Sequence, residues 1–165
     1  MFKKLLITSL IVSYSLSDVG MLTKIVDGDT IHFGNTICRF AYVDTPESRK
    51  NSRLENKLEK CSGVIVESMI SAGKESKQYI EETLIKGKTY KYNVISTDRY
   101  DRKVCEIYNN SEMLNLKIVE DGYAVPYDTY IPKNLKAEFS KSSKEAKRLK
   151  KGLYKSNPSA INCIE

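Results

Sequence analysis

The chain has 165 residues, which is enough for one domain with a full hydrophobic core and short for two. Hydrophobic residues make up 41% and charged residues 29%, proportions that are typical of globular proteins and exclude a disordered polypeptide. Lys and Arg outnumber Asp and Glu by 27 to 21, and the pI is near 9.0. This excess of positive charge favours a polyanionic partner such as nucleic acid or an anionic surface, although solubility alone would also account for it.

Residues 1–17 have the features of a targeting segment. Two lysines precede an apolar run at residues 5–16 that is short for a bilayer span, and the small residues at its end suit a signal peptidase. We therefore expect a cleaved signal peptide and an exported mature domain of residues 18–165, in a secreted or periplasmic location. An uncleaved N-terminal anchor is the alternative. For the mature domain we expect a monomer with no stable membrane partner.

Three strands are predicted near the start of the mature chain, at residues 21–26, 30–33 and 39–43. A turn at Gly28 joins the first two strands, and a tight Gly-Asn hairpin leads into the third. Because a meander returns its strands side by side, Asp29 in the first turn is expected near Asp44 at the end of the third strand.

The third strand leads into a stretch that brings a cation and two acids together. Arg39 lies on the strand, Pro46 breaks the extended run, and the break leaves Asp44 and Glu47 at the strand end. A cation and two acids gathered there suit a metal-assisted attack on a phosphate better than they suit a hydrophobic core.

The middle of the chain is expected to contain a loop, a helix and two further strands. Residues 47–60 are polar without periodicity and are interpreted as an exposed loop. Residues 61–85 have helical spacing, with Gly73 as an interruption. Two strands are predicted at residues 89–95 and 103–108.

A charged turn precedes the last of these strands and holds Arg102 at its start. A guanidinium is the side chain best shaped to hold two phosphate oxygens at once, so Arg102 is a candidate phosphate ligand. The alternative is a surface salt bridge from Arg102 to Asp98 or Asp101.

Two helices are predicted in the C-terminal part. The first covers residues 112–121 and stops at Gly122, and the second is capped by Asn134 and ends at Gly152. The loop between them contains three tyrosines that could stack on bases or sugars, or could cover a barrel mouth: Tyr123, Tyr127 and Tyr130.

The order of these elements indicates an α+β, mainly β, fold. Three strands, a helix, two strands and further helices fit a five-stranded OB-type Greek-key barrel with about three helices, a class that binds oligonucleotides. Four cysteines allow three complete pairings in an exported chain, and the sequence does not choose among them: Cys38, Cys61, Cys105 and Cys163. Cys38 and Cys105 could equally be small buried side chains. The single histidine, His32, lies in a predicted strand and is interpreted as structural.

Four motifs occur in the order found in staphylococcal nuclease. They are Asp27-Gly28-Asp29-Thr30, the stretch from Arg39 to Glu47, Asp98-Arg99-Tyr100-Asp101-Arg102, and Val119-Glu120-Asp121-Gly122-Tyr123-Ala124. The chain resembles the thermonuclease family over about residues 21–155. The resemblance implies an OB-fold nuclease that uses Ca²⁺ to hydrolyse phosphodiester bonds of DNA and RNA with little sequence specificity, leaving 3′-phosphate ends.

The resemblance also implies roles for individual residues. Asp29, Asp44 and the backbone carbonyl of Thr45 look like Ca²⁺ ligands, with Asp27 as a further acid beside the metal. Glu47 looks like the glutamate that orients or deprotonates the attacking water. The resemblance further suggests that two arginines, Arg39 and Arg102, stabilise charge on the phosphate. It also suggests four residues that contact the substrate: Arg99, Tyr100, Tyr127 and Tyr130.

The chain departs from the family pattern at Asp101, where the family usually has glycine, and in the segment of residues 47–73, which is longer and contains Cys61. Two other functions stay open. One is a catalytically inactive OB-fold module that binds single-stranded nucleic acid, although none of the expected carboxylates is lost. The other is a cationic surface protein that adheres to polyanions, which leaves the catalytic set unexplained.

Overall fold

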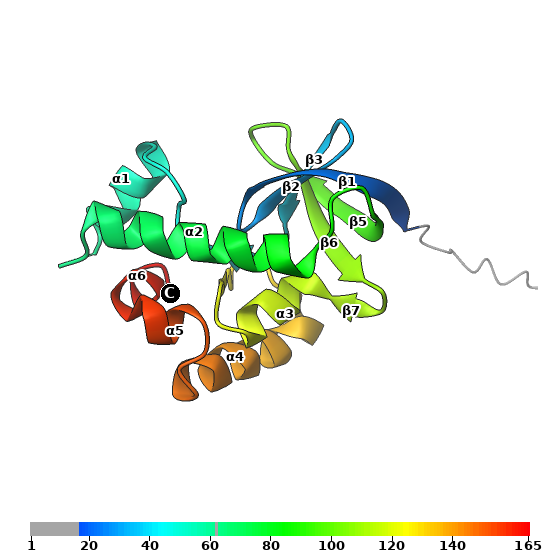
Figure 1. Cartoon of the computed structure of the whole chain (residues 1–165). Helices are drawn as coiled ribbons and strands as arrows, with labels where there is room; N and C mark the ends of the chain where they lie inside the picture. Colours follow the sequence, from blue (N-terminus) through cyan, green and yellow to red (C-terminus); the bar gives the residue numbers. More distant parts are fainter. Residues whose placement is uncertain (1–16, 62) are drawn as a thin grey trace, which may run out of the picture.

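The computed structural model describes residues 17–61 and 63–165 (Figure 1). Residues 1–16, nearly all of the expected signal peptide, lie outside the described residues. Among the helices that are described, none has both the length and the apolar character needed to cross a membrane.

Five strands form a barrel, and its neighbouring strands follow the order β3-β2-β1-β5-β6. Each of these neighbouring pairs is antiparallel, and a parallel pairing of β3 with β6 closes the barrel. The predicted α+β fold with a five-stranded barrel of OB type is therefore confirmed. The strands are β1 (Asp18–Asp27), β2 (Thr30–Phe33), β3 (Thr36–Phe40), β5 (Thr89–Thr97) and β6 (Lys103–Asn109), with a short β7 (Glu112–Met113) beside β6.

The third strand lies three residues earlier in the sequence than predicted. It stops at Phe40 instead of continuing to residue 43, because Tyr42 adopts a positive φ of 69° that is incompatible with a strand. The chain then forms a separate short strand, β4 (Val43–Asp44), which pairs with β8 (Val125–Pro126). This turn takes Asp44 off the barrel sheet and directs it toward the helical part of the molecule.

The barrel interior is filled by apolar side chains, and α2 (Val66–Thr83) packs against the barrel (Figure 1). Its Ile80 is fully buried among the strand residues that make up the main core, which include Leu22, Ile31, Phe33, Phe40 and Ile107. Burial of such side chains is the dominant source of stability in a domain of this size.

A fully buried polar side chain, Asn115 on α3 (Leu114–Glu120), lies at the edge of this core. Its amide nitrogen donates to the carbonyls of Ala41 at 3.0 Å and Cys105 at 2.9 Å, and its oxygen accepts from the Ile107 N–H at 2.8 Å. These bonds fix α3 against β6 and against the turn that carries the chain toward Asp44.

Six helices occur in the described residues, whereas about three were expected. The three expected ones correspond to α2, α3 and α4 (Lys133–Arg148), and the additional ones are short: α1 (Ser52–Leu58), α5 (Leu153–Ser156) and α6 (Pro158–Cys163). The predicted cap at Asn134 is wrong, because α4 starts at Lys133 and Pro132 takes the N-cap position, two residues before the predicted cap. The helix also ends at Arg148, and Gly152 instead precedes α5.

The interpretation of residues 47–60 as an exposed loop is wrong. Asn51 accepts a hydrogen bond from the Leu54 N–H at 2.8 Å and so caps α1. Leu54 is buried in a second apolar cluster formed with α2 and the C-terminal helices. A helix of seven residues is too short for its apolar periodicity to stand out in the sequence.

Gly73 does not interrupt the helix, since α2 is continuous from Val66 to Thr83. Because Gly73 has no side chain, the backbone of another segment can pack against α2 at this position. A Cβ atom at this position would come within 2.4 Å of the backbone carbon and oxygen of Glu47. The glycine therefore lets the segment that carries Glu47 lie directly against α2.

All four cysteines are paired. Cys38 on β3 is bonded to Cys105 on β6, across the pair of strands that closes the barrel. Cys61, just after α1, is bonded to Cys163 at the end of α6. The second bridge fastens the segment that follows α1 to the C-terminal part of the chain.

Candidate active site

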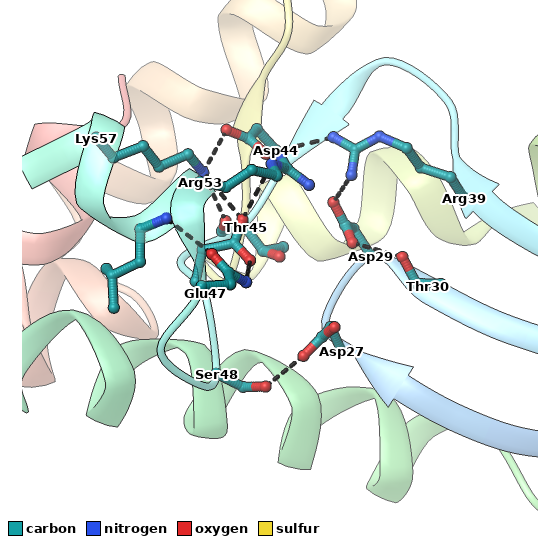
Figure 2. Close-up of polar contacts among 12 residues, drawn as sticks. Asp27, Asp29, Thr30, Arg39, Asp44, Thr45, Glu47, Ser48, Arg53 and Lys57 are labelled. Atoms are coloured by element: carbon teal, nitrogen blue, oxygen red, sulfur yellow. Dashed lines mark hydrogen bonds and ion pairs between the residues drawn. The ribbon is translucent and has the colours of Figure 1, made fainter. Parts of the chain in front are cut away.

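Acidic and basic side chains from the turn after β1, from β3, from β4 and from α1 meet beside the barrel (Figure 2). Asp29 is 5% exposed; its Oδ1 accepts from the Thr30 hydroxyl at 2.9 Å and its Oδ2 from Arg39 Nη1. Burial would raise the pKa of Asp29, but the positive charges of Arg39, Arg53 and Lys57 and the Thr30 bond outweigh it and hold that pKa below its usual value. Asp29 is therefore ionised at neutral pH.

Arg39 connects two carboxylates that the sequence places fifteen residues apart. It binds Asp29 through Nη1 and reaches Asp44 Oδ1 through Nη2 at 3.3 Å. Burial alone would lower the pKa of Arg39, and the two aspartates instead raise it above its ordinary value. The expected proximity of Asp29 and Asp44 is thus mediated by a guanidinium between them.

Helix α1 adds two cations that the sequence analysis did not consider. Lys57 Nζ lies 2.7 Å from Asp44 Oδ2 and donates to the Thr45 carbonyl at 3.1 Å. Arg53 bridges the two acids, with Nη2 at 3.1 Å from Asp44 Oδ1 and Nε at 3.3 Å from Glu47 Oε1. Four-residue spacing puts both side chains on one face of a helix, but that signal is informative only once a helix is recognised.

Glu47 is 8% exposed and is held from two directions. Its Oε2 accepts from the Asn51 side-chain amide at 2.8 Å, and its Oε1 faces Arg53. Its backbone lies against Gly73 of α2. Glu47 is consequently a carboxylate in a defined orientation rather than a mobile loop residue.

Asp27 lies at the margin of this cluster. It accepts a hydrogen bond from the Ser48 hydroxyl and faces Arg49 Nη2 at 3.4 Å. Ser48 follows Glu47 directly, so Asp27 ties the end of β1 to the segment that carries Glu47 (Figure 2).

A pocket of about 700 Å³ opens beside the acidic cluster. Its wall includes four arginines, which give it a positive character suited to phosphate: Arg39, Arg53, Arg99 and Arg102. The three tyrosines predicted to contact the substrate also line it, and all three are exposed: Tyr100, Tyr127 and Tyr130. The rings of Tyr127 and Tyr130 meet edge to face, with centroids 4.9 Å apart.

Residues 37–156 match the family model described as staphylococcal nuclease homologue. The chain belongs to the staphylococcal nuclease family. The predicted resemblance is therefore confirmed. The matched region contains the arginines of the pocket and the acids from Asp44 onward, whereas Asp27 and Asp29 precede it.

Curated proteins that resemble this nuclease homologue include endonuclease YhcR of Bacillus subtilis, which is 30% identical over 151 residues, covering 84% of this chain and 11% of the relative. A probable staphylococcal-like nuclease, CAN3, of Oryza sativa subsp. japonica is 33% identical over 87 residues, covering 52% of this chain and 22% of the relative. The chain thus spans only about a tenth to a quarter of these relatives' length.

In this nuclease homologue Arg102 is held by Asp98, so the salt bridge considered from the sequence does form. Asp98 Oδ2 accepts from Arg102 Nε at 2.8 Å and lies 2.7 Å from Nη2. Asp101, where the resemblance predicts glycine, has a positive φ of 61°, a conformation that glycine adopts without strain. Among the described residues, the acid that binds Arg102 is Asp98, not Asp101.

The oxygens expected to bind a metal fit a hard divalent cation by their chemistry. Asp44 Oδ2 and the Thr45 carbonyl already converge on a single cationic group, and both are oxygen donors of the kind that Ca²⁺ prefers. Asp29 is turned toward Arg39. Within residues 17–61 and 63–165, no three His, Cys, Asp or Glu side chains are grouped closely enough to hold a metal ion by themselves.

Proposed function

We propose that this domain is a Ca²⁺-dependent nuclease that hydrolyses phosphodiester bonds in DNA and RNA with little sequence specificity. The observation that supports it most directly is the cluster in which Arg39 joins Asp29 to Asp44 beside the oriented carboxylate of Glu47. This cluster borders a pocket that Arg102 also lines. Carboxylates for a metal, a base for water and guanidiniums for phosphate together suit phosphodiester hydrolysis, in which phosphate oxygens gain negative charge.

In this proposal Asp29, Asp44 and the Thr45 carbonyl hold Ca²⁺, with Asp27 as a nearby acid. When bound, the ion would stabilise the negative charge that the phosphate oxygens gain during the reaction. Glu47 accepts a proton from the attacking water as the water oxygen bonds to phosphorus. Asn51 keeps the Glu47 carboxylate oriented for that transfer through the 2.8 Å hydrogen bond to Oε2.

The arginines bind the phosphate. Arg39 and Arg102 donate to its non-bridging oxygens as the 5′ P–O bond breaks, which leaves a 3′-phosphate and a 5′ oxygen that takes a proton from solvent. Four residues contact the neighbouring nucleotides: Arg99, Tyr100, Tyr127 and Tyr130. The exposed rings of the three tyrosines accept stacked bases of any sequence. The positive charge of the chain supports attraction to the polyanionic substrate. We further propose that the protein is exported and acts as a monomer.

Digestion of single-stranded DNA by the purified protein tests this function. Reactions contain Ca²⁺, Mg²⁺ or a chelator, and Glu47→Gln is compared with Glu55→Gln, an exposed glutamate on α1 that serves as a matched control. We expect cleavage that requires Ca²⁺, falls by about 10²-fold or more in Glu47→Gln and is unchanged in Glu55→Gln. Salt-sensitive binding without cleavage in any reaction would instead identify an inactive OB-fold binding module.

A further inference from the structure

A lysine from α1 lies where two of the proposed metal ligands converge. Lys57 Nζ is 2.7 Å from Asp44 Oδ2 and 3.1 Å from the Thr45 carbonyl oxygen, and Glu47 Oε1 is 3.8 Å away (Figure 2). One ammonium therefore contacts oxygens from a β-strand end, from the backbone that follows it and from the proposed base.

Arg53, the other cation of α1, is placed differently. It binds Asp44 through the opposite oxygen, Oδ1, and binds Glu47, and it lines the pocket. The Thr45 carbonyl accepts its hydrogen bond from Lys57. Of these two cations, Lys57 is thus the one that contacts both Asp44 Oδ2 and the Thr45 carbonyl oxygen.

We propose that Lys57 competes with the metal ion for its site and sets the Ca²⁺ concentration at which the nuclease becomes active; the inference rests on the metal site proposed above. Ca²⁺ binds its oxygen ligands at about 2.3–2.6 Å. An ammonium in contact with the same two oxygens would overlap such an ion and repel it strongly. Metal binding therefore requires the lysine to leave.

The chemistry of the side chain suits this exchange. Lysine carries a compact charge on a flexible stem, so it can bind carboxylates in the absence of the metal and swing into solvent when the metal arrives. Lys57 is in the last turn of α1 and its side chain is 19% exposed, so its ammonium is close to solvent. While it is bound, it supplies a counter-charge to acids that would otherwise repel one another.

Calorimetric titration with Ca²⁺ tests the competition by binding rather than by activity. Lys57→Met removes the competing charge, Arg53→Met removes an equal charge from the same helix, and Lys60→Met removes an exposed charge just beyond it. We expect Lys57→Met to bind Ca²⁺ at least about tenfold more tightly than the wild type and Lys60→Met to have no effect. Arg53→Met also removes a charge beside Asp44, so its affinity should rise, but by clearly less than that of Lys57→Met, because Arg53 does not contact the Thr45 carbonyl.

Amine labelling of the wild-type protein gives a second measurement that needs no Lys57 variant. Acetic anhydride is applied with and without Ca²⁺, and the modification of each lysine is quantified by mass spectrometry. The released ammonium should react several-fold faster in Ca²⁺, while Lys60 reacts at a constant rate. In Asp44→Asn, which removes a metal ligand, Ca²⁺ should no longer increase the labelling of Lys57.

The two proposals can fail separately. Any of three results would overturn the competition. The first is equal Ca²⁺ affinity in Lys57→Met and the wild type, and the second is an equal gain in Ca²⁺ affinity in Lys57→Met and Arg53→Met. The third is labelling of Lys57 that Ca²⁺ does not increase. If Ca²⁺-dependent cleavage is then still observed, the nuclease proposal stands without it. Absence of Ca²⁺ binding by the wild type and by every variant would overturn both the competition and the metal site.

Discussion

Asp98 binds Arg102 through a single carboxylate oxygen, Oδ2, which accepts from Nε at 2.8 Å and lies 2.7 Å from Nη2. The other oxygen, Oδ1, accepts from the backbone N–H groups of Tyr100 at 2.9 Å and Arg102 at 3.0 Å. The same aspartate thus shapes the turn before β6 and aims the guanidinium at the pocket. Arg102 is held in one orientation before any phosphate is present.

The first prediction concerns Arg102 itself. Arg102→Ala should lower the turnover of single-stranded DNA by about 10³-fold or more, because a positioned arginine in phosphoryl transfer contributes on this scale. Ca²⁺ affinity should remain as in the wild type, since this side chain is bound to Asp98 and not to the acidic cluster. Arg148→Ala, which removes an exposed arginine of α4, is the control and should keep wild-type turnover. Turnover by Arg102→Ala equal to that of the control would rule out the proposed role.

Acid should destabilise the protein through Asp98 and Asp29. Burial would raise the pKa of each carboxyl. For Asp98 the hydrogen bonds from Arg102 and Tyr100 outweigh burial, and for Asp29 chiefly the charge of Arg39 does, so both folded-state pKa values lie below those of an aspartate in the unfolded chain. The unfolded chain then takes up protons first as pH falls, so this stabilisation is fully present above about pH 4 and is lost below it.

Urea unfolding at pH 7, 4 and 3 measures this effect. The free energy of unfolding should fall between pH 4 and pH 3 in the wild type, and the fall should be smaller in Asp98→Asn by about 1 kcal/mol. An identical fall in the two proteins would show that Asp98 does not contribute to acid sensitivity.

Gly73→Ala tests the close contact between α2 and the segment carrying Glu47. At an exposed helical position this change would stabilise a protein by up to about 1 kcal/mol, because alanine is the better helix former. Here the added methyl group would meet the backbone of Glu47, so we expect a loss of about 1–3 kcal/mol and a lower rate of DNA cleavage. Ser71→Ala on the exposed side of the same helix is the control, and thermal unfolding of both variants provides the comparison. An increase in the melting temperature of Gly73→Ala would contradict the contact.

The bridge between Cys61 and Cys163 should contribute substantially to stability. It joins residues 102 apart in the sequence, and cross-links that close long loops restrict the unfolded chain the most. Replacement of both cysteines by serine should lower the free energy of unfolding by about 2–4 kcal/mol in chemical denaturation. The bridge between Cys38 and Cys105 remains in this variant and provides the internal reference. Equal stability of variant and wild type would mean that the C-terminal helices hold the segment without the bridge.

Local chemistry made several features of this protein predictable from sequence. Strand periodicity and turn-forming residues placed all five barrel strands within three residues of their observed bounds, because apolar alternation and glycine turns act over short distances. The motifs around Asp29, Asp44 and Arg102 led to the family, which the comparison confirmed. The catalytic roles of these residues stay predictions.

Only the tertiary structure decided how the site is held together. Arg39 lies between Asp29 and Asp44, and Gly73 supports Glu47 from a helix 26 residues later, contacts that depend on packing between distant segments. The positive φ of Tyr42 and the short helix that delivers Arg53 and Lys57 gave no periodic signal. Periodicity reports which face of a segment is buried, but it does not report which distant side chain that face will meet. For this reason the acids, Arg39 and Arg102 could be identified from the sequence, whereas Arg53 and Lys57, which contact the acids, could be found only in the folded chain.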